Sequence, residues 1–195
     1  MHAGECTRHR GHRRAPLRGV DQRELSQARV LGIDPSLSLG WAVLDGPGLH
    51  AHGLLRLDLI KGRGARGRRV LECLEQVGEL LTAYRPARLA YEQVPLHRSF
   101  RSPDACLAYA TVVGCLEAAA VRANVPVVPV PAAHVKKLAT GNGRAKKEGP
   151  GGVRGAANAR WGDLGSDDIA DALWVALAAA GPQGDVRRVA DLLDT

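Results

Sequence analysis

The order of the apolar segments is the feature that most limits what this chain can fold into. Three short strand-like segments come first, separated by turn residues, and helical and strand-like segments then alternate. The predicted elements are, in chain order, strands at 30–34, 40–44 and 49–57, a helix at 65–84, a strand at 88–94, a helix at 103–123, a strand at 125–130 and a helix at 166–180. This order predicts an α/β fold with a five-stranded mixed sheet and helices on both of its faces.

The helix predicted at 103–123 is almost free of charge. Between Asp104 and Arg122 its only charged residue is Glu117. A helix that is apolar on all sides must be covered on more than one of them, here by the sheet and by a partner subunit. The strand at 125–130 contains two prolines, which cannot donate to a sheet ladder, so it is expected at an edge or with an abrupt start.

The charge of the chain points to a polyanionic partner. The net charge is +7 and the pI is near 9.7. Residues 1–29 carry seven Arg and three acids and are predicted to form a flexible basic arm, either adding phosphate affinity or being an extension without function. The folded body is predicted at 30–181, and 182–195 form a tail.

Two further segments are basic and rich in glycine. Residues 61–69 precede the first helix, where they could contact a DNA backbone or simply form a solvated loop. Residues 141–155 contain six glycines and four bases and are predicted to be a mobile loop or a poorly formed helix.

The cysteines and the absence of a leader favour a cytoplasmic protein. The four Cys residues form no CxxC pair, and three lie in apolar stretches, which is typical of buried thiols in a reducing compartment. No signal peptide is recognised, and the longest uncharged helical stretch, 105–116, is too short to span a bilayer. We therefore expect no membrane partner.

Four acidic residues are candidates for the chemistry. Asp34 ends the first strand, Glu92 lies in the fourth, and Asp168 and Asp171 share one face of the last helix, directed away from its apolar stripe. A carboxylate cluster binds Mg²⁺ or Mn²⁺, and two such ions can hydrolyse a phosphodiester bond. Without metal, the acids would repel one another.

Each acid also has an ordinary structural explanation. Asp34 precedes a proline and could open a turn, Asp168 could complement a helix dipole, and Asp171 could lie on a solvated face. Glu92 is harder to explain in this way, because a charge inside an apolar strand is uncommon. Spacing does not choose between Asp167 and Asp168, since Asp167 also shares a face with Asp171.

Five segments of the chain form an ordered set of motifs: 31–36 (LGIDPS), 91–94 (YEQV), 135–137 (VKK), 141–147 (GNGRAKK) and 168–173 (DIADAL). Together they resemble the motifs of the RuvC family, which are Holliday junction resolvases with a ribonuclease-H-like fold. The resemblance covers about residues 30–181. It places the four catalytic, metal-binding acids of the family at Asp34, Glu92, Asp168 and Asp171.

The resemblance implies a homodimeric endonuclease that cuts four-way DNA junctions by paired symmetric nicks during recombination and repair. It implies two Mg²⁺ ions per active site, with Mn²⁺ able to substitute, a nucleoid setting in the cytoplasm, and a branch-migration helicase as a candidate partner. The functional lysines of the family match Lys136 and Lys147, which would hold DNA together with Arg144. Both lysines could instead be ordinary surface residues.

Two departures from the family pattern concern DNA recognition. Where the family usually has an aromatic residue after Glu-Gln-Val, this chain has Pro95; Phe100 could replace that wedge or pack in the core. The glycines after Lys147 interrupt an expected helix. Two alternative functions therefore stay open: a phage-type nuclease for flaps and other branched DNA with relaxed specificity, and a non-catalytic nucleic-acid-binding module on the same fold.

Overall fold

A five-stranded sheet forms the centre of the computed structural model, which describes residues 29–95, 102–143 and 152–180. The strands are β1 (Val30–Asp34), β2 (Ser38–Asp45), β3 (Gly48–Arg56), β4 (Arg88–Gln93) and β5 (Val127–Pro131). Their spatial order is β3-β2-β1-β4-β5, with antiparallel pairing among the first three and parallel pairing from β1 through β4 to β5. The expected antiparallel meander, the mixed sheet and the edge position of the proline-containing strand are confirmed.

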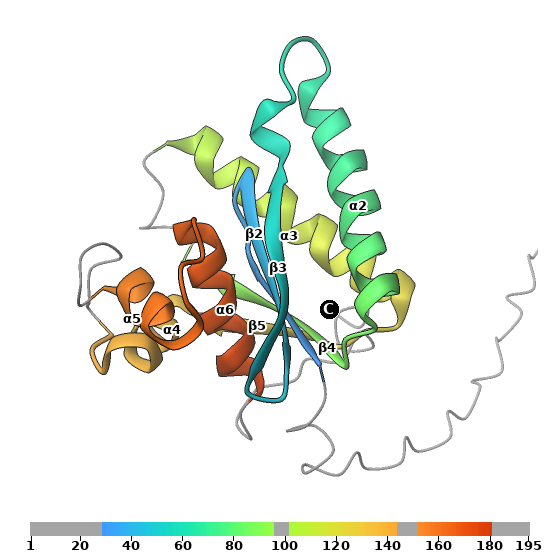
Figure 1. Ribbon diagram of the computed structural model, residues 1–195. Helices are drawn as coiled ribbons and strands as arrows, with labels where there is room; N and C mark the ends of the chain where they lie inside the picture. Colours follow the sequence, from blue (N-terminus) through green and yellow to red (C-terminus); the bar gives the residue numbers. More distant parts are fainter. Residues whose placement is uncertain (1–28, 96–101, 144–151, 181–195) are drawn as a thin grey trace, which may run out of the picture.

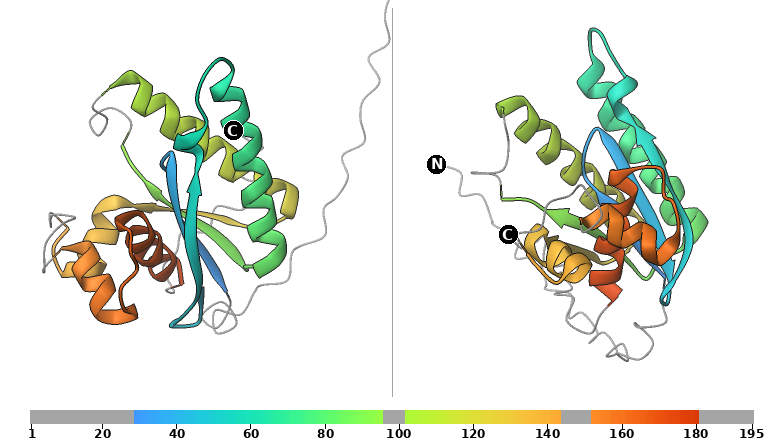
Figure 2. Two further views of the ribbon diagram at one scale, coloured as in Figure 1. Left: turned by 45° about the horizontal axis from the view of Figure 1, so that its top comes forward. Right: turned by 60° about the vertical axis from the view of Figure 1, so that its left-hand side comes forward.

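Helices cover both faces of this sheet (Figures 1 and 2). The helices are α2 (Ala65–Tyr84) and α3 (Pro103–Ala123) on one face, and α4 (Ala132–Thr140), α5 (Val153–Trp161) and α6 (Asp167–Ala180) on the other; the short 3-10 helix η1 (Leu57–Leu59) precedes α2. Each layer has its own apolar core against the sheet. The predicted α/β fold class is confirmed.

In the α2–α3 layer, local sequence signals mark both ends of α3. The side chain of Ser102 accepts a hydrogen bond from the amide of Ala105 and caps α3, and Asn124 ends the helix in the left-handed conformation. Cys73 on α2 and Cys115 on α3 are buried in this core, as expected, whereas Cys106 near the start of α3 is only half-buried. Burial raises the pKa of Cys73 to about 12.

The other layer is built around α6, which lies very close to the sheet. A methyl group at Gly32 of β1 would overlap the backbone oxygen of Ala172 and lie 2.6 Å from the backbone nitrogen of Ala176. Glycine at position 32 is therefore what lets the helix backbone contact the strand. At the C-terminal end of α6, the buried Arg88 donates a hydrogen bond to the carbonyl oxygen of Ala179 at 2.6 Å.

Two helices were not predicted, α4 and α5. Both are short, and the packing of Val135, Val153 and Ala157 against α6 stabilises them, a contribution that no local pattern indicates. Part of the predicted mobile loop, residues 144–151, lies outside the described residues, as do 1–28 of the predicted arm and the whole predicted tail. Arg29, at the end of that arm, pairs with Asp45 at 2.8 Å.

The long apolar helix α3 differs from the expectation in one respect. It is long and apolar enough, by length and composition alone, to cross a membrane, with a mean hydropathy of 1.5 over its most apolar window. The expectation that this segment is too short to span a bilayer considered only the uncharged stretch 105–116. The whole helix has 21 residues and contains few charges. One side of α3 packs on α2 and the sheet.

Candidate functional site

Two predicted acids lie at the same end of neighbouring strands. Asp34 is the last residue of β1 and Glu92 is the last but one of β4, and the parallel register pairs Ile33 with Tyr91 just before them. The carboxyl ends of parallel strands meet at one edge of a sheet, so the two acids stand side by side there. Both are buried, with exposed fractions of 8% for Asp34 and 5% for Glu92.

The start of α6 reaches the same end through a second glycine contact. Gly40 of β2 pairs with Asp34 in the sheet, and a methyl group at Gly40 would overlap the backbone of Asp168 and lie 2.8 Å from its Cβ. Asp168 therefore sits directly beside the strand pair that ends in Asp34. Glycine at position 40 lets the start of α6 approach β2 more closely than any side chain there would allow.

Asp171 lies one turn further along α6 and is only 3% exposed. The expectation that Asp168 and Asp171 share an outward face is therefore wrong for Asp171, while Asp168 is half-buried. The reason is that α6 is enclosed by the sheet together with α4 and α5, so its side chains from Ile169 to Ala176 are all buried. The apolar stripe that the sequence predicts on this helix is thus only part of the buried surface of α6.

Asp167 and Asp168 have different surroundings in the structure. Asp167 forms an ion pair with Arg154 of α5, with 3.1 Å between the guanidinium nitrogen and the carboxylate oxygen. Asp168 instead lies against Gly40 beside Asp34. Asp167 thus connects two helices, and Asp168 is the acid placed at the sheet end.

Tyr109 of α3 is a residue of this site that sequence reasoning missed. Its hydroxyl donates to the carbonyl oxygen of Glu92 and accepts from the amide of Val94, both at 3.0 Å. Burial raises the pKa of Tyr109, the Val94 amide lowers it, and the negative charges of Glu92 and Asp34 raise it further. Tyr109 therefore stays neutral and fixes the backbone that carries Glu92.

Arg56 at the end of β3 is a second residue that was not predicted. Its guanidinium holds the carboxylate of Asp58 through two hydrogen bonds of 2.8 and 2.9 Å. The bond to Asp58 raises the pKa of Arg56, and the charge of Asp168 adds to this. A cation thus lies near the most exposed of the four acids, a position that only the folding of β3 beside β2 reveals.

The four candidate carboxylates do not form a ready-made metal cluster. Among the described residues, no three His, Cys, Asp or Glu side chains stand in an arrangement that could hold a metal ion. Carboxylates held close together without a counter-ion repel one another, and a divalent cation offsets that repulsion. The donor set itself fits a hard divalent cation, since it consists of carboxylate oxygens from three elements, β1, β4 and α6, at one end of the sheet.

The predicted DNA-binding residues are less well placed by the structure. Lys136 is half-buried on α4, which begins at the same end of the sheet because it follows β5 directly. Phe100, Arg144 and Lys147 lie outside the described residues. Pro95, in the position of the missing aromatic residue, is exposed.

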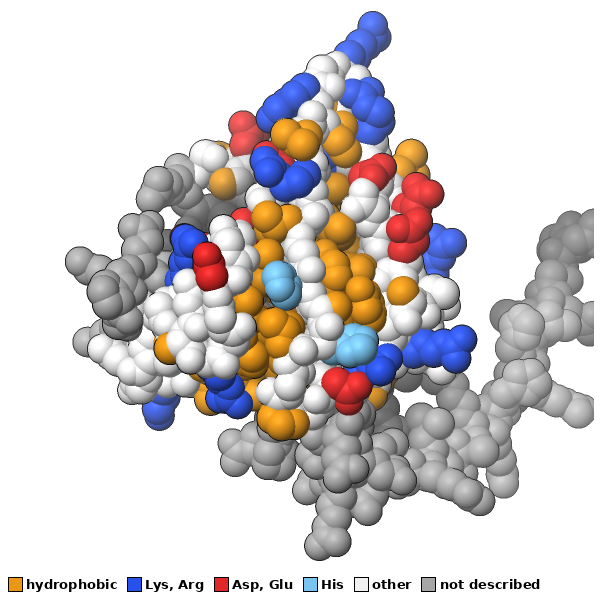
Figure 3. Space-filling view, in the orientation of Figure 1, with side chains coloured by type: hydrophobic (Ala, Val, Ile, Leu, Met, Phe, Trp, Pro, Cys, Tyr) orange, Lys and Arg blue, Asp and Glu red, His pale blue; other side chains and the backbone are white. Residues whose placement is uncertain are grey.

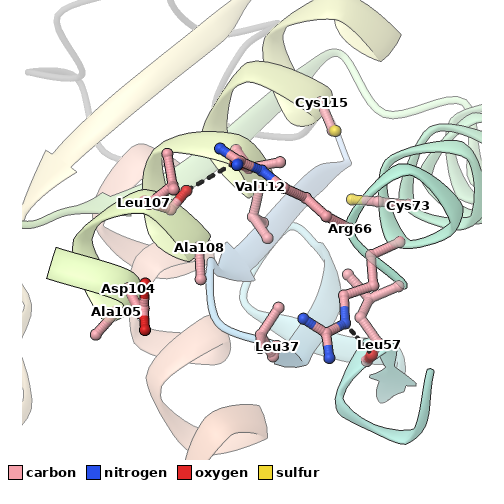
Figure 4. A pocket seen from close by; sticks show the side chains of 12 residues that line it. Leu37, Leu57, Arg66, Cys73, Asp104, Ala105, Leu107, Ala108, Val112 and Cys115 are labelled. Carbon is pink, nitrogen blue, oxygen red and sulfur yellow. Dashed lines mark hydrogen bonds between the residues drawn. The ribbon is translucent and has the colours of Figure 1, made fainter. Parts of the chain in front are cut away.

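A separate pocket of about 430 Å³ lies between the N-terminal halves of α2 and α3 (Figure 4). Its walls are mainly apolar, from Leu37 and Leu57 to Cys73, with Arg66 reaching across it toward α3. The four acids do not line it. The pocket is therefore distinct from the acidic end of the sheet.

Comparisons with known proteins converge on one family. The family described as crossover junction endodeoxyribonuclease RuvC matches residues 30–179. The RuvC proteins of Halorhodospira halophila and Sorangium cellulosum are each 35% identical to this chain over 78% of its length, covering 89% and 86% of their own. The structure of T. thermophilus RuvC in complex with Holliday junction substrate superposes with a TM-score of 0.66 at 26% identity, covering 78% of this chain and 93% of that one.

Proposed function

Because the chain belongs to the RuvC family of crossover junction endodeoxyribonucleases, we propose that Asp34, Glu92, Asp168 and Asp171 are the carboxylates with which it hydrolyses DNA. The observation that carries this assignment is the close approach of α6 to the sheet at Gly40, which puts Asp168 beside the partner strand of Asp34. Membership of the family makes the chain a divalent-metal-dependent nuclease, as expected from its sequence.

The substrate proposed is a four-way DNA junction, cut by paired symmetric nicks in recombination and repair. The relative solved with a Holliday junction supports this choice, as does the net charge of +7. The products would carry 5′-phosphate and 3′-hydroxyl ends. We place the protein with the nucleoid in the cytoplasm, where such DNA is found.

We assign two Mg²⁺ ions to the site, with Mn²⁺ able to replace them. Bound there, divalent ions supply Lewis acidity that activates water and stabilises the leaving oxygen of a phosphodiester. The buried ends of β1 and β4 fix Asp34 and Glu92, and Tyr109 holds the Glu92 backbone in place. Lys136, on the helix that follows β5, is proposed to hold a phosphate of the cut strand.

The two neighbouring aspartates at the start of α6 give a sharp test of the assignment. Asp168→Asn is expected to lower the single-turnover rate of junction cleavage by about 10³-fold, because one ligand charge of the site is lost. Asp167→Asn is expected to change it less than about threefold, because Asp167 makes only a half-exposed ion pair to Arg154.

The measurement is a strand-specific cleavage time course on a synthetic junction with saturating protein and Mg²⁺. Circular dichroism would check that both variants fold. The assignment would be overturned if Asp167→Asn abolished cleavage and Asp168→Asn did not.

We also infer that a second copy of the chain covers the exposed side of α3. Leu107, Ala110, Gly114 and Ala118 are all exposed, uncharged and spaced along one side of the helix. Two copies meeting there in an isologous contact would place two cutting sites on one junction, as paired nicks need.

Ala110→Glu is expected to convert a dimer into a monomer, because it buries an unpaired charge in the contact. Sedimentation analysis would measure the mass, and the cleavage map should change from paired to independent nicks. Leu71→Glu, an exposed apolar position on α2, is the matched control and should leave the mass unchanged. An Ala110→Glu variant with the mass of the wild type would rule out this surface.

A further inference from the structure

A basic tip, residues 61–69, lies outside the set of residues assigned to the acidic end of the sheet. Its nine residues contain five Lys or Arg and no acid. In Figure 1 it comprises the turn after η1 and the first residues of α2 at the top of the molecule, and Figure 3 shows Lys and Arg side chains gathered there. Neither the four carboxylates nor Lys136 belongs to it.

Part of the tip is used to hold its own shape. Arg68 donates to the carbonyl oxygens of Lys61 at 2.6 Å and Arg63 at 2.7 Å, closing the turn on itself. Gly62 and Gly64 take positive φ angles of 82° and 73°, which favour glycine. The turn is therefore a defined structure that presents its remaining side chains in fixed places.

Arg69 connects the tip to the segment before it in the same way. It donates to the carbonyl oxygens of Leu57 at 3.1 Å and Ile60 at 2.8 Å. Lys61, Arg63 and Arg66 remain exposed, and none of them forms an ion pair recorded within 29–95, 102–143 and 152–180. Lys61 and Arg63 thus stay available to an anion outside the protein, while Arg66 reaches across the pocket toward α3.

Helix stability does not explain this charge. Arg66 and Arg68 stand in the first turn of α2, where the helix dipole disfavours cations, and that turn contains no acid. Gly67 also lies inside α2 although a methyl group there would meet nothing within 4 Å. Because glycine has no side chain, the backbone of another molecule can approach the helix closely at position 67.

The basic tip is continuous with the candidate active site. Arg56 and Asp58 lie just before the tip in the chain. The pKa of Arg56 is raised in part by the charge of Asp168. The Asp58 amide donates a hydrogen bond to the carbonyl oxygen of Leu37 at 2.9 Å. Leu37 belongs to the short loop that leaves Asp34. A strand held at the acids therefore has a basic surface beside it.

We propose that the basic tip binds the phosphate backbone of a duplex arm of the branched DNA substrate. The proposal rests on the function proposed above and adds a second contact surface to it. Exposed cations with no acid among them, on a preformed turn, suit phosphates spaced along a duplex. Such contacts position an arm without reading its sequence.

The test compares two full-length double variants that lose the same charge. Lys61→Gln with Arg63→Gln removes two exposed cations of the tip, and Arg85→Gln with Arg160→Gln removes two exposed cations elsewhere. Binding to a four-way junction and to plain duplex is measured in EDTA from about 50 to 300 mM salt. Single-turnover cleavage at saturating protein is measured separately in Mg²⁺.

The tip variant should bind both DNAs about tenfold or more weakly near 0.1 M salt, with a salt slope reduced by about 2. Its cleavage rate at saturation should stay within about threefold of wild type, because the tip does not touch the reacting phosphate. Binding by the control variant should match wild type. If the salt slope of the tip variant is unchanged while the wild-type protein binds and cuts the junction, the proposal for the basic tip is overturned and the proposed function stands. If the wild-type protein neither binds nor cuts the junction, both proposals are overturned.

Discussion

Asp34→Asn is expected to reduce the single-turnover rate of junction cleavage by about 10³-fold or more, while the affinity for the junction stays within about threefold. The carboxylate of Asp34 is buried at the end of β1, where a metal ligand cannot be replaced by solvent. The loss corresponds to about 4 kcal/mol of transition-state stabilisation. Strand-specific cleavage and a binding titration in EDTA measure the two quantities.

Asp45→Asn is the matched control for this change. Asp45 is an exposed aspartate at the other end of the β1–β2 pair, where it forms a surface ion pair with Arg29. Such a pair contributes about 1 kcal/mol or less, so cleavage by the control should equal that of wild type. Full cleavage by Asp34→Asn would remove Asp34 from the mechanism.

Gly32→Ala is expected to lower the free energy of unfolding by about 3 kcal/mol. The added methyl group would meet backbone atoms of Ala172 and Ala176, which cannot turn aside as a side chain can. The whole of α6 would have to shift, and it carries Asp168 and Asp171. Cleavage should therefore fall by more than stability alone explains, even at temperatures where the variant is fully folded.

Thermal denaturation measures the first effect, with an expected fall of about 6–12 °C in Tm. Gly78→Ala provides the comparison, because Gly78 lies in α2 with nothing within 4 Å of an added methyl group. It should raise stability by up to about 1 kcal/mol and leave cleavage unchanged. A Gly32→Ala variant as stable as wild type would show that α6 does not need this close contact.

The elements whose boundaries depend on local signals were the ones predicted well. The helices at 65–84 and 103–123 were predicted with the limits that the structure gives them. Their ends follow from residues close in the chain, such as Ser102 at the start of α3 and Pro86 after α2. The five motif segments likewise identified the family, and Asp34 and Glu92 lie together because parallel strands share an end.

What could not be predicted depends on contacts between distant segments. The helices α4 and α5 form because they pack on α6, as the 5.0 Å ring separation of Trp161 and Trp174 illustrates. Asp171 was expected to face outward because its own helix shows an apolar stripe elsewhere. Its burial comes from neighbours that the stripe does not reveal. The contacts of Tyr109 and Arg56 with the acidic end also arise only on folding.

The most direct test of the central claim is to locate divalent ions in crystals of the full chain soaked in Mn²⁺, using anomalous scattering. The four carboxylates are expected to draw together around the metal, with anomalous peaks about 2.1 Å from oxygens of Asp34, Glu92, Asp168 and Asp171 and roughly 4 Å from one another. Peaks elsewhere only, or none at this end of the sheet at saturating Mn²⁺, would contradict the account.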